Sequence, residues 1–292
     1  MKDHLIKSTV YDGMIRAYAI RSTNTVKEAQ TRQDTWATAS AALGRTVTIG
    51  AMMGAMLKDN ESLTVKVEGN GPIGAIIADS DATGDVRGYV TNPYVDFDLN
   101  DQGKLDVARA VGEGNISVVK DLGLKDYFTG HVPIVSGEIG DDFTYYFANS
   151  EQIPSAVGAG VLVNPDHSIQ AAGGFIVQVM PGADDDVIAQ VEETIANMPT
   201  ISQLIKEGTS PEGILERLFE VDKVTVHGRL PVRFQCKCSK ERLQRAVTGL
   251  GKEEIQSMID EDHGAEATCH FCNEVYRFTE EELQELKESA HS

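Results

Sequence analysis

QCKCS (residues 235–239) and TCHFCN (residues 268–273) are the most informative segments in the C-terminal part of this 292-residue chain. They contain all the cysteines of the protein, Cys236, Cys238, Cys269 and Cys272, spaced as C-x-C-x₃₀-C-x-x-C. A tetrahedral Zn²⁺ takes four such soft ligands from two short chelating segments. The sequence therefore predicts one Zn²⁺ per chain, bound by these four thiolates in the reduced protein, with His270 outside the ligand set.

Other uses of the cysteines compete with zinc. Static disulfides would suit a secreted protein, but the segment after Met1 has no apolar run or cleavage site typical of a signal peptide. A thioredoxin-like C-x-x-C opens a helix after a strand. Cys269 and Cys272 instead lie between residues 265–268 and 274–278, which read as the two arms of a hairpin. Zinc is therefore preferred over disulfides, a thioredoxin motif or unconnected thiols.

Charge and hydropathy restrict the class of protein. The chain carries 45 acidic and 26 basic residues, a net charge of −19, and such a field repels nucleic acid and anionic membranes. The longest apolar run, residues 47–57, is shorter than the roughly 18 residues of a membrane-spanning helix. We therefore expect a soluble, cytoplasmic protein that binds neither nucleic acid nor membrane.

Residues 1–182 are expected to form an α/β (α+β) domain built on a mixed sheet. Alternation and apolar content predict strands in adjacent runs, with helices interspersed. We expect strands at residues 14–21, 62–68, 73–79, 86–91, 116–122, 132–138, 156–164 and 168–180, and helices at residues 26–33, 34–57, 105–111 and 141–149.

Three local features of this domain have competing interpretations. Asn24 or Thr25 is expected to cap the first helix, and Asp34 the second. The methionines of the second helix are assigned to the core rather than to an adaptable binding surface. Residues 69–74 match G-x-G-x-x-G, but a strand follows instead of a helix, so these glycines indicate a hairpin rather than a dinucleotide site.

Residues 183–230 are predicted to form a helical linker. An apolar stripe at helical spacing begins it, formed by Val187, Val191, Ile195 and Met198. Two further amphipathic helices follow. Such a stripe is normally buried against another element of the protein. We expect that the linker can detach from the surface that buries this stripe.

Residues 231–292 are expected to form a small zinc-binding domain. Helices are predicted at residues 239–248 and 253–259, before the hairpin of the second cysteine pair. Thr279 and Glu282 match the capping box of a last helix.

Basic residues surround the first cysteine pair, although the protein as a whole is acidic. They are Arg233, Lys237, Lys240, Arg242 and Arg245, with Glu241 as the single acid between residues 232 and 249. This basic cluster would offset the charge of four thiolates and keep the thiols ionised, although an ordinary solvated helix face has the same composition. A zinc ion held here would serve either structure or a redox switch, and composition does not decide between them.

The cysteine spacing resembles that of the redox-regulated 33 kDa heat-shock chaperone family, bacterial holdases with a C-terminal zinc switch. Further motifs of the first domain fit the same family in order and spacing. They are VRGY at residues 86–89, SEQIPS at 150–155, and AAGGFIVQ at 171–178, which leads to MPG at 180–182. The resemblance extends over nearly the whole chain.

This resemblance implies an ATP-independent chaperone rather than an enzyme, without catalytic residues, that binds unfolded or misfolded client proteins under oxidative stress. The reduced, zinc-bound form would be inactive. Oxidation would join Cys236 to Cys238 and Cys269 to Cys272, release the metal, and unfold the C-terminal domain together with the linker. The activated form would be a homodimer.

Two other classes of protein stay open. A thiol-disulfide oxidoreductase would use Cys269 and Cys272 catalytically. A zinc-ribbon binding protein would hold a purely structural metal with the same four ligands. The acidic balance and the lack of an extended basic face count against a ribbon that binds nucleic acid.

Overall fold

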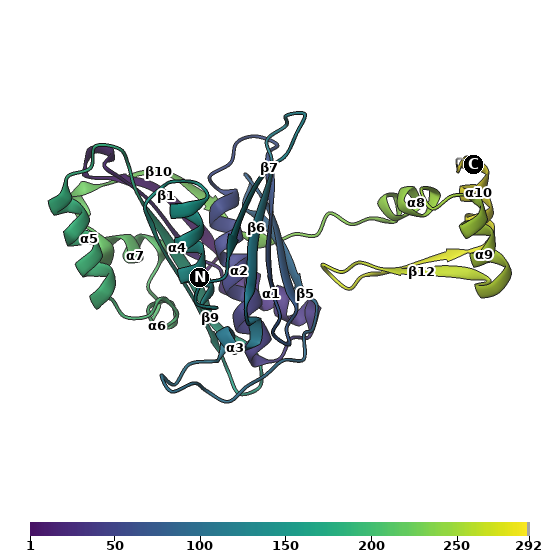
Figure 1. Ribbon diagram of the computed structural model, residues 1–292, viewed down its shortest axis with the longest axis horizontal. Coiled ribbons are helices and arrows are strands. Elements are labelled where there is room, and N and C mark those ends of the chain that lie inside the picture. Colours follow the sequence, from purple (N-terminus) through teal and green to yellow (C-terminus); the bar gives the residue numbers. More distant parts are fainter. Residues whose placement is uncertain (291–292) are drawn as a thin grey trace. The chain divides into compact units, whose positions relative to one another are not determined.

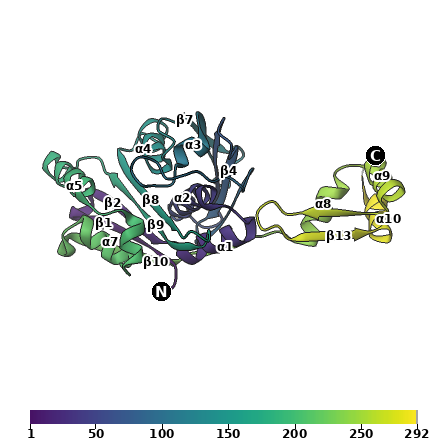
Figure 2. The same ribbon diagram turned by 90° about the horizontal axis from the view of Figure 1, so that it is seen from below.

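The computed structural model describes residues 1–290, which divide into two compact units, Met1–Gln235 and the residues from Cys236 onward. The first unit contains two β-sheets with a buried helix between them, and further helices cover the outer face of one sheet (Figures 1 and 2). The second unit contains helices and a β-hairpin. The expected α/β class is therefore confirmed.

The first sheet has the strand order β10-β1-β2-β9-β8, with antiparallel neighbours throughout. Its strands are β1 (His4–Val10), β2 (Ile15–Arg21), β8 (Ser155–Val163), β9 (Ile169–Val179) and β10 (Val224–Pro231). Strand β10 comes from the predicted helical linker and pairs with β1 at the edge of the sheet. This pairing was not predictable from local sequence patterns, because the two strands are distant in sequence.

The second sheet has the strand order β11-β5-β4-β3-β6-β7. Its strands are β3 (Ser62–Gly69), β4 (Ala75–Asp81), β5 (Asp85–Val90), β6 (Gly114–Asp121), β7 (Phe128–Pro133) and β11 (Arg233–Phe234). Strand β11 pairs with β5 in parallel, whereas the other pairs are antiparallel. The mixed sheet expected within residues 1–182 is therefore wrong, because its one parallel strand comes from residues 233–234 and the strands of residues 1–182 pair only in antiparallel fashion. The glycine-rich residues 69–74 join the antiparallel strands β3 and β4, which confirms the hairpin interpretation.

Helix α2 (Ala37–Gly54) is the centre of the first unit (Figure 2). It is buried along its whole length and contacts strands of both sheets. Glycine permits this close approach: a Cβ atom at Gly44 would lie 2.6 Å from a methyl group of Val26. Met52 and Met53 are buried in this core, which confirms their structural assignment.

Two predicted helix caps are wrong. Helix α1 (Thr23–Gln33) begins earlier than expected, and its first turn donates the Thr25 amide to the Asp3 carboxylate at 2.7 Å. Burial raises the pKa of Asp3, and the hydrogen bonds from Thr25 partly offset that shift. Asp34 ends α1 in a left-handed conformation, with φ of 51°, instead of opening α2.

The strand predicted at residues 132–138 is also largely wrong. Strand β7 ends at Pro133, and the Asp142 carboxylate accepts hydrogen bonds from the amides of Val135 and Ser136 at 2.9 and 2.8 Å. Asp142 belongs to helix α4 (Ile139–Asn149). These bonds hold the preceding residues as a loop at the start of α4. The remaining helix of this region is α3 (Val107–Val111).

Three helices cover the face of the first sheet opposite to α2: α5 (Asp185–Asn197), α6 (Ile201–Lys206) and α7 (Pro211–Leu218) (Figure 1). In the predicted stripe, Val191 is buried, while Val187, Ile195 and Met198 are partly buried against the same apolar cluster. Helix α7 is held more deeply than α5, because Ile214, Leu215 and Leu218 are all buried there.

The second unit has a small core of its own. Its elements are α8 (Lys240–Thr248), α9 (Lys252–Asp262), β12 (Gly264–Thr268), β13 (Val275–Thr279) and α10 (Glu280–Ser289). The buried side chains are Val247, Ile255, Phe278, Leu283 and Ala290. Thr279 and Glu282 form the predicted capping box at the start of α10.

Candidate metal centre

Two short segments of the second unit bring the four cysteine sulfurs together. Cys236 and Cys238 lie in the extended segment before α8, and Cys269 and Cys272 lie in the connection between β12 and β13. All four Sγ atoms lie within 4.8 Å of one another. Over residues 1–290, the metal-ligating group at this place consists of these cysteines and does not include His270.

The spacing of the sulfurs fits a tetrahedral site. The Sγ atoms of Cys236 and Cys269 are 3.7 Å apart, and those of Cys238 and Cys272 are 3.3 Å apart. Zn–S bonds of about 2.3 Å place tetrahedral sulfurs about 3.8 Å apart, whereas a disulfide bond measures about 2.05 Å. The four cysteines are therefore close enough to hold one metal ion, and an all-thiol donor set is compatible with zinc.

Backbone hydrogen bonds build the turn that presents the second cysteine pair. The Cys269 amide donates to the Glu274 carbonyl at 3.0 Å, and the Asn273 amide donates to the Cys269 carbonyl at 2.8 Å. Asn273 takes the left-handed conformation, with φ of 56°, that closes the turn. Cys269 and Cys272 thus sit in a hairpin, as predicted, and not at the start of a helix as a thioredoxin motif would.

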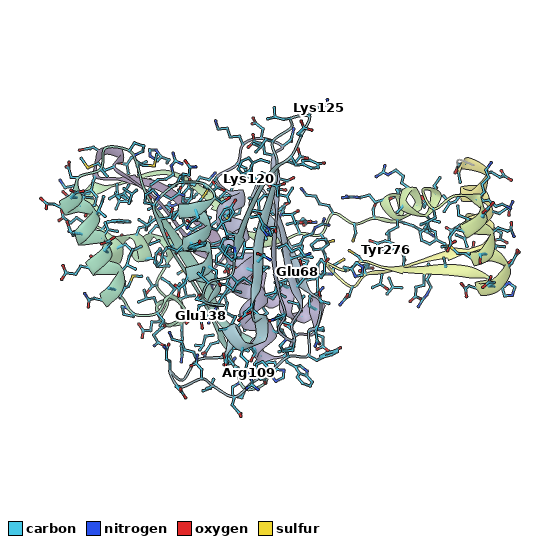
Figure 3. The ribbon with its side chains drawn as sticks, in the orientation of Figure 1. Glu68, Arg109, Lys120, Lys125, Glu138 and Tyr276 are labelled. Atoms are coloured by element: carbon cyan, nitrogen blue, oxygen red, sulfur yellow. The ribbon has the colours of Figure 1, made fainter. Side chains whose placement is uncertain are left out.

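Tyr276 contacts the centre, although the cysteine pattern gave no indication of it. It lies on β13 (Figure 3), and its hydroxyl is 3.2 Å from Cys238 Sγ. Hydrogen bonds of this kind orient metal ligands and tune their affinity. Strand alternation could have placed Tyr276 on the inner face of β13. It lies on the same face as Phe278, which packs into the core of this unit.

Burial controls the ionisation of two of the thiols. It raises the pKa of both Cys238 and Cys272. The hydrogen bond to Cys238 raises the pKa of the Tyr276 hydroxyl, which therefore keeps its proton and can donate it to the sulfur. For Cys238 and Cys272, burial thus opposes the ionisation that nearby basic residues were expected to favour. A metal that binds them as thiolates must displace their protons.

Some residues of the basic cluster form ion pairs with acidic side chains. Arg233 belongs to the first unit and donates to Asp85 at 2.6 Å. Lys240 pairs with Glu282 of α10. These carboxylates are distant in sequence, so the local excess of positive charge seen in the sequence is partly offset in the fold.

Comparison with known proteins identifies the family. A family model described as "Hsp33 protein" matches residues 3–279. The chain belongs to the Hsp33 family. The resemblance stated from the cysteine spacing and the motifs of the first domain is therefore confirmed.

Relatives of the Hsp33 family match over essentially their full length. A "33 kDa chaperonin" of Oceanobacillus iheyensis is 71% identical over 289 residues, which cover 99% of this chain and 100% of the relative. One of Bacillus subtilis is 61% identical over 287 residues and covers 98% of both chains. The crystal structure of the 33 kDa chaperonin (heat shock protein 33 homolog) of Thermotoga maritima has a TM-score of 0.92 and 40% identity, with 99% of each chain covered.

The names of these Hsp33 relatives are those of chaperones, which agrees with a binding protein rather than an enzyme. A chaperone family implies that the ligands are unfolded polypeptides. Among the helices of residues 1–290, none combines the length and the apolar content needed to cross a membrane.

Proposed function

We propose that this protein is a redox-regulated, ATP-independent holdase that binds unfolding proteins under oxidative stress. The group of four cysteine sulfurs within 4.8 Å of one another, in a unit with a small core, carries the proposal. In the reduced protein Cys236, Cys238, Cys269 and Cys272 would hold one Zn²⁺. When bound, the metal would supply four strong cross-links to a domain that has few apolar contacts.

The energetics favour a large response to loss of the metal. Structural zinc contributes roughly 10–16 kcal/mol to folding in small domains. The whole stability of a small domain is about 5–15 kcal/mol. A domain that loses such a site is therefore expected to unfold, and the second unit would convert sulfur oxidation into a change of structure.

The chemical step is the oxidation of thiols to disulfides. Each pair of zinc-bound thiolates would give two electrons to hydrogen peroxide, which takes up two protons from the solvent and becomes two waters while the S–S bond forms. We propose Cys236–Cys238 and Cys269–Cys272 as the pairs. A disulfide sulfur is no longer a thiolate ligand, so the site would lose its metal.

The chain would work in three parts: residues 1–182 as the core domain, 183–230 as the linker, and 231–292 as the switch. The packing of the linker supports its release. A cavity of about 590 Å³ lies where α5 and α6 meet the first sheet, lined by Met198, Ile201, Val161 and Phe175 among others. The side chains at this joint therefore have fewer packing neighbours than those of a filled core. Release would uncover the apolar faces of both the helices and the sheet.

The partners follow from this mechanism. Uncovered apolar surface would bind unfolded or misfolded client proteins and would also join two activated chains as a homodimer. We place the protein in the cytoplasm, where a reducing environment would keep the four thiols available for zinc until oxidative stress.

The test is the suppression of client aggregation by reduced, peroxide-treated and re-reduced protein. We expect no suppression before oxidation, strong suppression after it, and loss of suppression on re-reduction. A Cys238→Ser variant should retain little zinc, because an alkoxide does not form at neutral pH. Equal suppression by the reduced and oxidised proteins would overturn the switch. Steady-state turnover of excess disulfide substrate would show an oxidoreductase instead.

A further inference from the structure

An aromatic cluster lies on the surface of the first unit and consists of Trp36, Tyr94 and His167. The ring of Trp36 is 5.6 Å from that of Tyr94 and 6.2 Å from that of His167, measured between centroids. Trp36 is 44% exposed and Tyr94 is 54% exposed. Tryptophan and tyrosine are enriched at the centres of binding surfaces. None of the three residues belongs to the linker or to the metal centre.

A carboxylate is held beside these rings. Asp96 Oδ1 accepts hydrogen bonds from the Thr38 hydroxyl and amide at 2.9 and 3.2 Å, which fastens the Tyr94 loop to the start of α2. The other oxygen, Oδ2, lies 4.0 Å from His167 Nε2. Rings and carboxylate are therefore positioned by the fold, and a ligand would find them largely preorganised.

The segments that carry the cluster are acidic. Residues 33–39, 91–99 and 163–169 contain no lysine or arginine. Their carboxylates are exposed and belong to Asp34, Asp96, Asp98 and Asp166. Hydrogen bonds from Ser168 lower the pKa of Asp166, which keeps it ionised at neutral pH.

The loop that carries Tyr94 already binds one cation to an aromatic ring. The Arg109 guanidinium carbon lies 4.1 Å from the centroid of Phe97, within the range of a cation–π contact. A second ring of the same loop, Tyr94, stands exposed beside Trp36. The combination of open aromatic faces with fixed carboxylates matches a cation carried on an apolar stem, which is a lysine or arginine side chain.

We propose that the aromatic cluster, together with Asp96, binds lysine and arginine side chains of unfolded polypeptides. The aliphatic stem would lie on Trp36 and the charged end would face the rings and Asp96. The inference rests on the proposed function for the nature of its ligand. It adds a preference: among unfolding proteins, basic segments would bind more tightly than neutral or acidic ones, and the net charge of −19 would favour their approach.

The protein contains its own reporter for the test, because Trp36 is its one tryptophan. The full-length protein is titrated with a short unstructured peptide of glycine, serine, leucine and lysine, and with an analogue in which glutamine replaces lysine. We expect the lysine peptide to change Trp36 fluorescence at lower concentration than the glutamine peptide, and added salt to reduce that difference.

Variants then locate the binding. Tyr94→Ala should weaken the lysine peptide about threefold to tenfold, as expected for one partly desolvated cation–π contact. Tyr94→Phe keeps a ring and should largely restore the affinity. Tyr127→Ala removes a 67% exposed tyrosine elsewhere on the same unit and should change nothing. Equal binding of the two peptides by the unaltered protein, or equal affinity in Tyr94→Ala, would overturn the proposal.

Aggregation assays on the same samples distinguish a failure of the proposed cation site from a failure of the proposed holdase function. If the oxidised protein suppresses aggregation of a client while Trp36 responds equally to both peptides, the cation site is wrong and the holdase function stands. If the oxidised protein suppresses no aggregation, the holdase function is wrong, and the peptide titration still decides whether the cluster selects lysine.

Discussion

Ile214→Ala should loosen the linker in the reduced protein. Ile214 is fully buried in the apolar cluster between α7 and the first sheet. Alanine is at least as good a helix former as isoleucine, so the change removes packing without disfavouring helix α7. The variant therefore isolates the contact that we propose to hold the linker in place.

The size of the effect follows from complete burial. Truncation of a buried isoleucine to alanine costs about 2–5 kcal/mol. If α5–α7 open as a unit, their open population should rise about 30-fold to several thousand-fold. Hydrogen exchange should show faster exchange of the amides of residues 185–218, while those of the central helix α2 stay protected. The reduced variant should then suppress client aggregation without peroxide.

A matched control comes from the same helix. Glu216 is exposed, so Glu216→Ala should leave both exchange and activity unchanged. Loss of protection in α2 together with α5–α7 would mean that the linker does not open separately. Selective opening of the linker without any client binding would refute its role as the latch. Val191→Asp, which places a carboxylate in the same apolar cluster, should act in the direction of Ile214→Ala.

Three predictions concern the metal centre. Tyr276→Phe removes the hydroxyl next to Cys238 Sγ and should weaken zinc about 10- to 100-fold in competition with a chelator; unchanged affinity would exclude a role for the hydroxyl. Burial raises the pKa of Cys238 and Cys272, so zinc must displace their protons to bind. The affinity for zinc should therefore rise with pH between mildly acidic and neutral buffer. A zinc affinity that does not change with pH would contradict this. Cys269 and Cys272 should form a disulfide before Cys236 and Cys238, because the C-x-C ring is smaller and more strained. Mass-spectrometric mapping of trapped thiols over time measures this order, and early loss of the Cys236 and Cys238 thiols would reverse it.

Features that depend on neighbours in sequence were predictable. The capping box of Thr279 and Glu282 needs four consecutive residues and forms as predicted. The turn around Cys269 and Cys272 and the glycine hairpin at residues 69–74 likewise carry their signals locally. The spacing of the cysteines placed all four candidate ligands, and the structure brings their sulfurs together.

Features that depend on distant partners were not predictable. The start of α1 is stabilised by Asp3, which comes from a separate segment before β1. Strand β10 is stabilised by antiparallel pairing with β1, which is distant in sequence. The Tyr276 hydroxyl lies 3.2 Å from Cys238 Sγ only because the fold brings strand β13 beside the distant segment before α8. In each case the stabilising contact is tertiary, and local propensity does not contain it.

The zinc content per chain, measured together with free thiols before and after peroxide, decides whether the four cysteines form a zinc-dependent redox switch. We predict one Zn²⁺ and four free thiols in the reduced protein, and loss of the metal in step with the thiols on oxidation. Reduced protein without zinc would contradict it. So would full zinc occupancy after the thiols of Cys236, Cys238, Cys269 and Cys272 have been oxidised.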